Sequence, residues 1–448
     1  MKVKFLSSAC VEIIHDDVKI LCDPWLIDGE YYGSWAHYPP FDFDPNYFDD
    51  VDFIYISHQH PDHFSVKTLS KLNKKIPVYI HNYHYKFLKN QIESLGFSVI
   101  ELDHNVRTNV KNDLFINILA ADNCNPELCY KFFGCGMKEK PSGSTYNDTM
   151  CVIDDGNEVI VNTNDCPFPL AKTSAKLIKQ KYRAVNLLLV GYNSAGPYPQ
   201  CFELNGDADY RSAKQTVTQK FFKYAEGYVN LLQPAFFLPF AGRYTLAGKN
   251  HILNDKRAAV ELEDAYNHFT TSENIDKNLS KCIILNSKDS FDLKTEASTA
   301  SYIPINLDAK KLYIKNILSK TKYDYEYLPT PKLETIKNLL DDSYSRFNRA
   351  RKELQFSTDT NLLIQLPENF YLLLSFDDAG FKIINKNMSE RFEKFVKIDL
   401  DPRLLHLLLQ GPKFANWNNC EVGSHLKFKR NPDSYESAIY YCLNFFHV

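Results

Sequence analysis

The sequence carries almost no excess charge of either sign. Its 448 residues include 52 Lys and Arg against 55 Asp and Glu, which gives a formal net charge of −3. A chain so nearly neutral exerts no long-range attraction on nucleic acid or on an anionic membrane, although a local basic pocket can still form. We therefore expect neither nucleic acid nor a membrane among its partners.

Long apolar runs and a secretory signal are also missing. No uninterrupted apolar stretch approaches the roughly 18 residues that a membrane span needs. The start, MKVKFLSSACVEII, does not pass from a charged region through an apolar region to small residues. The eleven cysteines are then most simply free thiols in a reducing compartment. These absences predict a protein of the cytoplasm.

Several common catalytic patterns are absent as well. The sequence contains no Ser-His-Asp arrangement, no P-loop, no dinucleotide-type glycine fingerprint and no internal repeat. Nucleophilic-serine, nucleotide-phosphate and hydride-transfer chemistry therefore have no sequence support, and another source of chemistry must be found.

Short strands and turns open the chain. The runs at 2–6, 10–14 and 18–22 predict a β-meander. Residues 150–165 predict a hairpin, because two apolar runs flank the turn dipeptide Asp155-Gly156. Strands and helix-like stretches alternate elsewhere, so we expect an α/β (α+β) fold in which helices cover sheets.

The length of the chain predicts two domains, because 448 residues exceed one ordinary core. We expect a catalytic domain over 1–265 and a polar linking region over 266–345. A smaller α+β domain is expected over 346–448, where helix-like residues precede three apolar strands and a further helix.

The stretch ISHQHPDHFS, which follows an apolar run, places His58, His60, Asp62 and His63 within six positions. His58 and His60 are two residues apart in an extended segment and project to the same side. Imidazole nitrogen suits Zn, Fe or Mn, and a carboxylate adds negative charge. A polar surface loop is the plain alternative, but this composition produces such a cluster by chance in about one chain in a thousand. The sequence therefore predicts one or two divalent transition metal ions, Fe or Zn.

The order H-x-H-x-D-H is also the signature of the metallo-β-lactamase superfamily, which this sequence resembles. The resemblance implies an αββα sandwich, with the first two histidines on one metal and Asp62 and His63 on a second. It further implies that Asp165, in VNTNDC, bridges the two metals. Asp23, in ILCDPW, resembles the superfamily's acid that orients a ligand, although a turn cap is the alternative.

Within this superfamily the sequence is similar to the CMP-N-acetylneuraminate hydroxylase family and related bacterial proteins. The likeness covers most of the chain, including the expected second domain. It is carried by the stretches ILCDPW, DFIYISHQHPDH, VNTNDC, LVGYNSAGPYP, LQPAFFLPFAGRY and WNNCEVGSHLKFKRNPDSY.

Two histidines of the superfamily pattern are missing. The stretch PSGSTYNDTM before Cys151 has no histidine, and Gly248 stands where the last one is expected. His251 is the nearest substitute, and His104 is a weaker one. The second metal position is therefore expected to be incomplete or completed by other groups.

The hydroxylase resemblance also implies a Rieske cluster, which needs paired Cys and His ligands, but no Cys-x-His occurs here. Cys124, Cys129 and Cys135 do not have iron–sulfur spacing, so we interpret them as structural cysteines. A hydroxylase of this kind would need electrons from a separate protein.

Candidate substrate contacts lie in two loops. Asn193, Ser194 and Gly196, in GYNSAGPYP, offer backbone donors to an anionic group. Arg243, in PFAGRY, could pair with a phosphate. A plain connecting loop and a surface ion pair are the alternatives. Trp35, Tyr38 and Phe41 are further candidates for a pocket wall or for the core, and Trp417, Asn418 and Asn419 for a contact between domains.

Three functions remain open from the sequence. The first is an iron-dependent hydroxylase of a small anionic, nucleotide-sugar-like substrate, supplied with electrons by a separate protein. The second is a hydrolase of a phosphoester or related bond, in which the metal lowers the pKa of a bound water and Asp62 orients or deprotonates it. The third is a non-catalytic binding protein with a degraded site.

Overall fold

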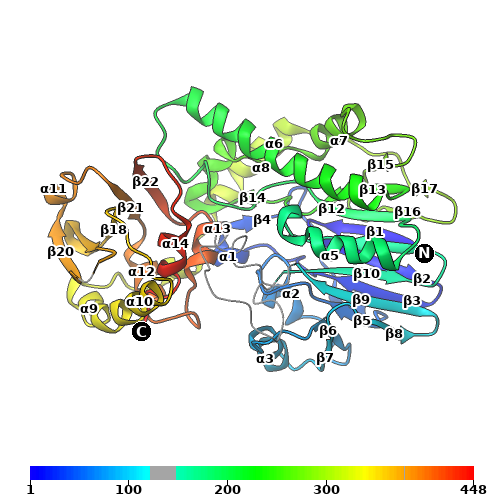
Figure 1. Cartoon of the computed structure of the whole chain (residues 1–448), viewed down its shortest axis with the longest axis horizontal. Coiled ribbons are helices and arrows are strands. Elements are labelled where there is room, and N and C mark those ends of the chain that lie inside the picture. The colour runs from blue at the N-terminus through cyan, green and yellow to red at the C-terminus, as the bar shows by residue number, and fades with distance from the viewer. Residues whose placement is uncertain (122–147, 378) are drawn as a thin grey trace.

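Two β-sheets form the larger part of the molecule (Figure 1). The computed structural model describes residues 1–121, 148–377 and 379–448, and every count of elements refers to these residues. The first sheet has eight strands in the order β17-β16-β1-β2-β3-β5-β6-β7. Their bounds are β1 Lys2–Ser7, β2 Cys10–His15, β3 Val18–Cys22, β5 Phe53–Tyr55, β6 Val78–His81, β7 Val99–Leu102, β16 Ser290–Asp292 and β17 Ala297–Ser298.

The second sheet has seven strands in the order β15-β13-β12-β11-β10-β9-β8. The hairpin expected around Asp155-Gly156 is present as the antiparallel pair β10 and β11. The bounds are β8 Arg107–Lys111, β9 Leu114–Ala120, β10 Thr149–Asp154, β11 Val159–Asn162, β12 Leu187–Gly191, β13 Phe236–Phe240 and β15 Lys281–Cys282.

The main core lies between the two sheets, since one buried cluster takes side chains from both. Successive residues of a strand point to opposite faces. On β12, Leu187 and Leu189 therefore enter this cluster, whereas Leu188 and Val190 belong to another one on the outer face of the second sheet. The same alternation gives the first sheet an apolar outer face.

Helices cover both outer faces, which completes four layers in the order helix, sheet, sheet, helix (Figure 1). Helices α2 (Val66–Leu69) and α3 (Phe87–Ser94) pack on the first sheet, and α5 (Phe168–Lys181), α6 (Asp207–Leu232) and α7 (Leu262–Thr271) pack on the second. The expected αββα sandwich is confirmed.

A separate five-stranded sheet with its own core lies toward the C-terminus, in the order β20-β19-β18-β21-β22. Its strands are β18 Asn361–Gln365, β19 Phe370–Leu374, β20 Phe381–Asn385, β21 Phe395–Asp399 and β22 Lys427–Asn431. The accompanying helices are α9 Leu333–Lys337, α10 Leu340–Glu353, α11 Lys386–Ser389, α12 Pro402–Leu409, α13 Trp417–Val422 and α14 Ser437–Leu443. The strands and helices expected after residue 346 are thus present.

The segment 266–345, expected to be only a linking region, contributes strands to both sheets of the sandwich. It supplies β15 to the second sheet and β16 and β17 to the first, followed by α8 (Leu307–Asn316). These strands have two or three residues each, which is too short for a periodic signal. The domain boundaries drawn from the sequence stay a prediction.

The helix-like stretch 66–75 forms only the short helix α2. The side chain of Ser65 caps the start of α2, and the helix ends at Leu69. Lys74 then donates a hydrogen bond to the carbonyl of Leu69, which satisfies a terminal acceptor of the helix. Among all described helices, none has the length and apolar character needed to cross a membrane.

His425 connects the C-terminal part to the short helix α1 (Glu30–Gly33). Its Nε2 donates to the carbonyl of Tyr31 at 2.7 Å, and its Nδ1 accepts from the hydroxyl of Tyr325 at 3.1 Å. Burial lowers the pKa of His425 to about 4. The neutral ring is therefore part of this junction.

This buried ring predicts acid sensitivity. Between about pH 6.5, the pKa of an exposed histidine, and about pH 4, the unfolded chain binds a proton that folded His425 does not bind. Stability is complete above this window and is lost as the pH falls through it. We expect the unfolding free energy of the wild type to fall by roughly 3 kcal/mol more than that of His425→Gln over this window. Urea unfolding at a series of pH values measures the difference, and parallel pH profiles would contradict it.

Candidate metal centre

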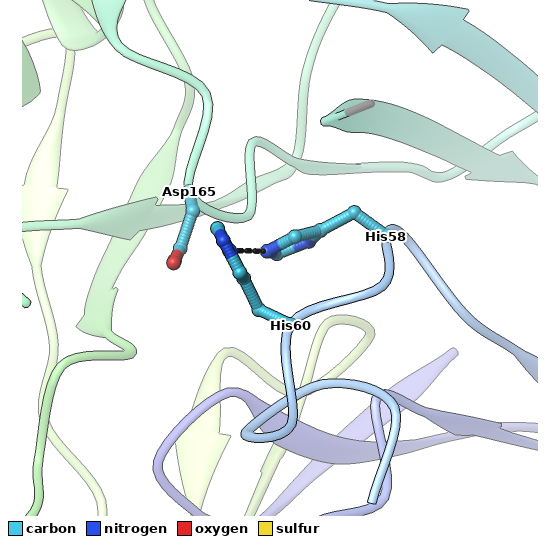
Figure 2. Close-up of side chains that lie close together, drawn as sticks. All are labelled: His58, His60 and Asp165. Atoms are coloured by element: carbon cyan, nitrogen blue, oxygen red, sulfur yellow. Dashed lines mark hydrogen bonds between the residues drawn. The ribbon is translucent and has the colours of Figure 1, made fainter. Parts of the chain in front are cut away.

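The histidine-rich loop and Asp165 meet at one edge of the sandwich. The loop follows β5 of the first sheet, and Asp165 follows β11 of the second. Two groups of side chains place their potential ligand atoms within 4.8 Å of one another: His58, His60 and Asp165, and Asp62, His63 and Asp165. Figure 2 shows the first group. Asp165 belongs to both.

His58 and His60 face each other through ring nitrogens. His58 Nε2 lies 2.9 Å from His60 Nδ1 (Figure 2). The other nitrogen of His60, Nε2, lies 3.0 Å from Oδ1 of Asn418 in α13. A carbonyl oxygen only accepts, so His60 donates from Nε2 and its Nδ1 lone pair faces His58. Burial lowers the pKa of His58 to about 4, which keeps its ring in the neutral form that binds metals.

Asp23 orients His63 by a hydrogen bond to its Nδ1. Its carboxylate is fully buried and accepts from His63 Nδ1 at 2.7 Å. It also accepts from the amide of Ser57 at 2.8 Å and from the hydroxyl of Ser57 at 2.7 Å. These bonds fix the tautomer of His63 and leave the lone pair on Nε2, as supporting carboxylates do in metal sites.

The other ring nitrogen of His63, Nε2, faces two carboxylates. This nitrogen is buried and makes no hydrogen bond within the described residues, yet it lies 3.3 Å from an Asp165 oxygen and 3.5 Å from an Asp62 oxygen. Burial alone would lower the pKa of His63, but Asp165, Asp62 and Asp23 raise it well above the usual value. Such a position attracts either a proton or a metal cation. The donor set and the unbonded buried nitrogen therefore fit a divalent metal ion.

The charge state of Asp165 agrees with this arrangement. Its side chain is half-buried, which would raise the pKa of its carboxyl. The neighbouring His63, His58 and His60 outweigh that effect and hold the pKa below its usual range. Asp165 is thus a carboxylate, the form that binds a metal.

Three side chains near the cluster were not assigned to it from the sequence. Asp148 is buried, with an oxygen 3.8 Å from His58 Nε2, and it lies just before Cys151, where a histidine was sought. Tyr31 donates a hydrogen bond to Asp62, and Asn418 accepts from His60. A search for any ligand type before Cys151, rather than for histidine alone, would have found Asp148.

Comparison with known proteins agrees with this geometry. Residues 2–124, which contain the histidine-rich loop, match the family model described as "Beta-lactamase superfamily domain". This part of the chain is similar to that superfamily domain. The resemblance that the H-x-H-x-D-H order indicated is therefore confirmed.

Individual proteins similar to this chain extend the comparison. The cytidine monophosphate-N-acetylneuraminic acid hydroxylase of Danio rerio is 26% identical over 276 residues, which cover 58% of this chain and 42% of that protein. The hydroxylase of Pongo pygmaeus is 23% identical over 473 residues, which cover 97% of this chain and 71% of that protein. Among solved structures, CmlA, a diiron beta-hydroxylase from Streptomyces venezuelae, has a TM-score of 0.41 at 15% identity, covering 65% of this chain and 53% of its own.

The two substitute histidines lie outside both ligand groups. His251, in the 3₁₀ helix Gly248–Lys256, donates from Nδ1 to the carbonyl of Gly248 at 2.9 Å. His104 is exposed, and its Nδ1 accepts from the amide of Ala120 at 3.1 Å. The expected cysteine cluster of Cys124, Cys129 and Cys135 lies outside the described residues.

Asn193 and Arg243, two of the candidate substrate residues, line one cavity of about 160 Å³. Tyr38 lines the same cavity. Asn193 is held by two hydrogen bonds to Val260, and a side chain at Gly242 would collide with it, so the two loops approach closely. Ser194 accepts from the amide of Gly196 beside them.

Of the two remaining aromatic candidates for a pocket wall, one is in the core and the other packs against it. Trp35 is fully buried and stacks on Tyr244, and Phe41 packs against the core under α2 and α3.

Proposed function

We propose that the chain is an iron-dependent hydroxylase of a small anionic substrate of the nucleotide-sugar type, supplied with electrons by a separate protein. The alignment with the hydroxylase of Pongo pygmaeus supports this most strongly, because it extends over 97% of the chain and includes the C-terminal part. The ligand groups support it further, since histidine and aspartate are suitable ligands for iron.

The residues that would hold the metal are His58 and His60 on one side, Asp62 and His63 on the other, and Asp165 between them. When bound, the metal would supply the activation of O2. The surrounding side chains orient the ligands. Asp23 and Asn418 orient two of the imidazoles, and the hydroxyl of Tyr31 fixes one oxygen of Asp62.

A hydrolase of a phosphoester or related bond is the second candidate. It is favoured by the absence of Cys-x-His from the sequence, because hydrolysis needs no electron source. In this case Asp62, oriented by Tyr31, would be the group that positions or deprotonates the attacking water.

Oxygen dependence separates the two proposals. Protein purified anaerobically should contain iron, and it should convert CMP-N-acetylneuraminate only when both O2 and a reductant are present. His58→Ala with His60→Ala should abolish turnover, whereas His104→Ala, a histidine outside both ligand groups, should leave it unchanged. Mass spectrometry of the product and elemental analysis of the protein are the measurements. Zinc as the sole metal, with turnover independent of O2, would favour the hydrolase and contradict the hydroxylase.

A further inference from the structure

The cavity that contains Arg243 is rich in positive charge. Four basic side chains line it, and only two acidic ones do so, Asp255 and Glu261. The lining therefore carries a surplus of two positive charges. The basic residues are Arg243, Arg257, Lys310 and Lys311.

Arg257 is the unusual member of this group, since it is only 6% exposed. Its Nη1 donates to the carbonyl of Tyr244 at 2.6 Å, and its guanidinium lies 3.5 Å above the ring of Tyr244. Its Nε and Nη2 are buried and have no hydrogen-bond partner within the described residues. A buried charged donor without a partner is costly, so this pair of donors calls for an acceptor.

The geometry of the two unbonded donors indicates what that acceptor is. Nε and Nη2 lie on one edge of the planar guanidinium and point the same way. Such an edge matches two oxygens of a carboxylate or phosphate group, which it binds in a bidentate manner.

Neighbouring cations reinforce this preference. Lys310 donates to Glu261, which neutralises one charge. Burial lowers the pKa of Lys310, and the proximity of Arg257 and Arg243 lowers it further against the opposing attraction of Glu261. Three cations thus lie near one another with a single bonded carboxylate, and an anion between them would relieve their repulsion.

A series of aromatic rings connects this cavity to the candidate metal centre. Tyr244, which lies under Arg257, stacks on Trp35 with 3.3 Å between ring centroids and an interplanar angle of 7°. Trp35 in turn contacts Tyr31, the residue that donates to Asp62. A continuous series of aromatic contacts therefore connects the lining of the cavity to Asp62.

We infer that the cavity lined by Arg243, Arg257 and Lys310 binds an oxyanion, a phosphate or carboxylate group, with Nε and Nη2 of Arg257 as its bidentate donors. The inference goes beyond the proposed function, because binding here needs neither a metal nor turnover.

Calorimetric titration of the purified full-length chain with inorganic phosphate tests this site. We expect one phosphate per chain, bound at least tenfold more weakly by Arg257→Lys, which keeps the charge but loses the planar edge. Lys310→Met, on the surface helix α8, should also weaken binding. This variant tests the site even if Arg257→Lys does not fold. Arg351→Lys is the matched control, because Arg351 is equally buried but donates to Asn348 and to the carbonyl of Phe376.

A second control separates this cavity from the metal centre. The His58→Ala, His60→Ala variant should bind phosphate as the wild type does. Loss of binding in that variant but not in Arg257→Lys would overturn the inference, and so would a wild type that binds neither phosphate nor acetate. Parallel titrations with phosphate and acetate show which group binds more tightly, and tight binding of either one supports the site.

Discussion

Asp165→Ala is expected to remove nearly all the metal from the purified protein. Asp165 is the one residue shared by the two ligand groups found among the described residues, so its loss leaves two ligands in each group. Loss of a supporting hydrogen bond alone typically costs about tenfold to a hundredfold in metal affinity, and loss of a shared carboxylate should exceed that. Turnover should fall by at least about a hundredfold with it. Elemental analysis and the O2-dependent assay measure the two effects.

The matched control for this prediction is Asp207→Ala. Asp207 is an exposed aspartate in the first turn of α6, far in sequence from the ligand loop. The Asp207→Ala variant should keep full metal content and a wild-type unfolding profile. Metal stoichiometry that stays unchanged in Asp165→Ala would show that the shared carboxylate is not a ligand.

Asp23→Asn is expected to lower both metal affinity and stability. Asp23 accepts three hydrogen bonds in a fully buried position, from the amide and hydroxyl of Ser57 and from His63 Nδ1. An asparagine has one accepting oxygen, so its NH2 group would face donors. His63 would then carry its proton on Nε2, the nitrogen that faces Asp62 and Asp165. We expect about a tenfold to hundredfold loss of metal affinity and roughly 2–3 kcal/mol of lost stability.

Competition with a metal chelator and urea unfolding of the metal-free protein measure these two losses separately. Ser57→Ala provides a graded comparison, because it removes one donor to Asp23 and keeps the bond to His63. It should cost about 1 kcal/mol of stability, and its loss of metal affinity should be smaller than that of Asp23→Asn, although the Ser57 hydroxyl also lies 2.9 Å from Nδ1 of His58. If Asp23→Asn bound metal as tightly as the wild type, Asp23 would have no part in orienting His63.

The features that could be predicted from the sequence are those encoded within a few adjacent residues. The meander strands and the hairpin at Asp155-Gly156 have local apolar patterns and turn residues, and both are present. The histidine cluster lies within six positions of one loop, and the family resemblance pointed from it to Asp165. The structure brings all these side chains together.

The features that could not be predicted depend on contacts between distant segments. Asn418 lies 358 positions from His60, and no local pattern connects them. Tyr31 reaches Asp62 from a four-residue helix with left-handed backbone angles at Tyr31 and Tyr32, which propensities do not foresee. Arg257 likewise looked ordinary in the sequence, because only the packed structure shows that two of its donors lack an acceptor.

The bond between His60 and Asn418 bears on how the molecule can be divided. Trp35 reaches the carbonyl of Val422 in the same α13 helix, and His425 holds the carbonyl of Tyr31. A fragment that contains only the N-terminal sandwich would therefore lose the hydrogen-bond partner of His60 and the contact of α13 with Trp35. The smallest unit suited to metal-binding work is the chain with its C-terminal sheet attached.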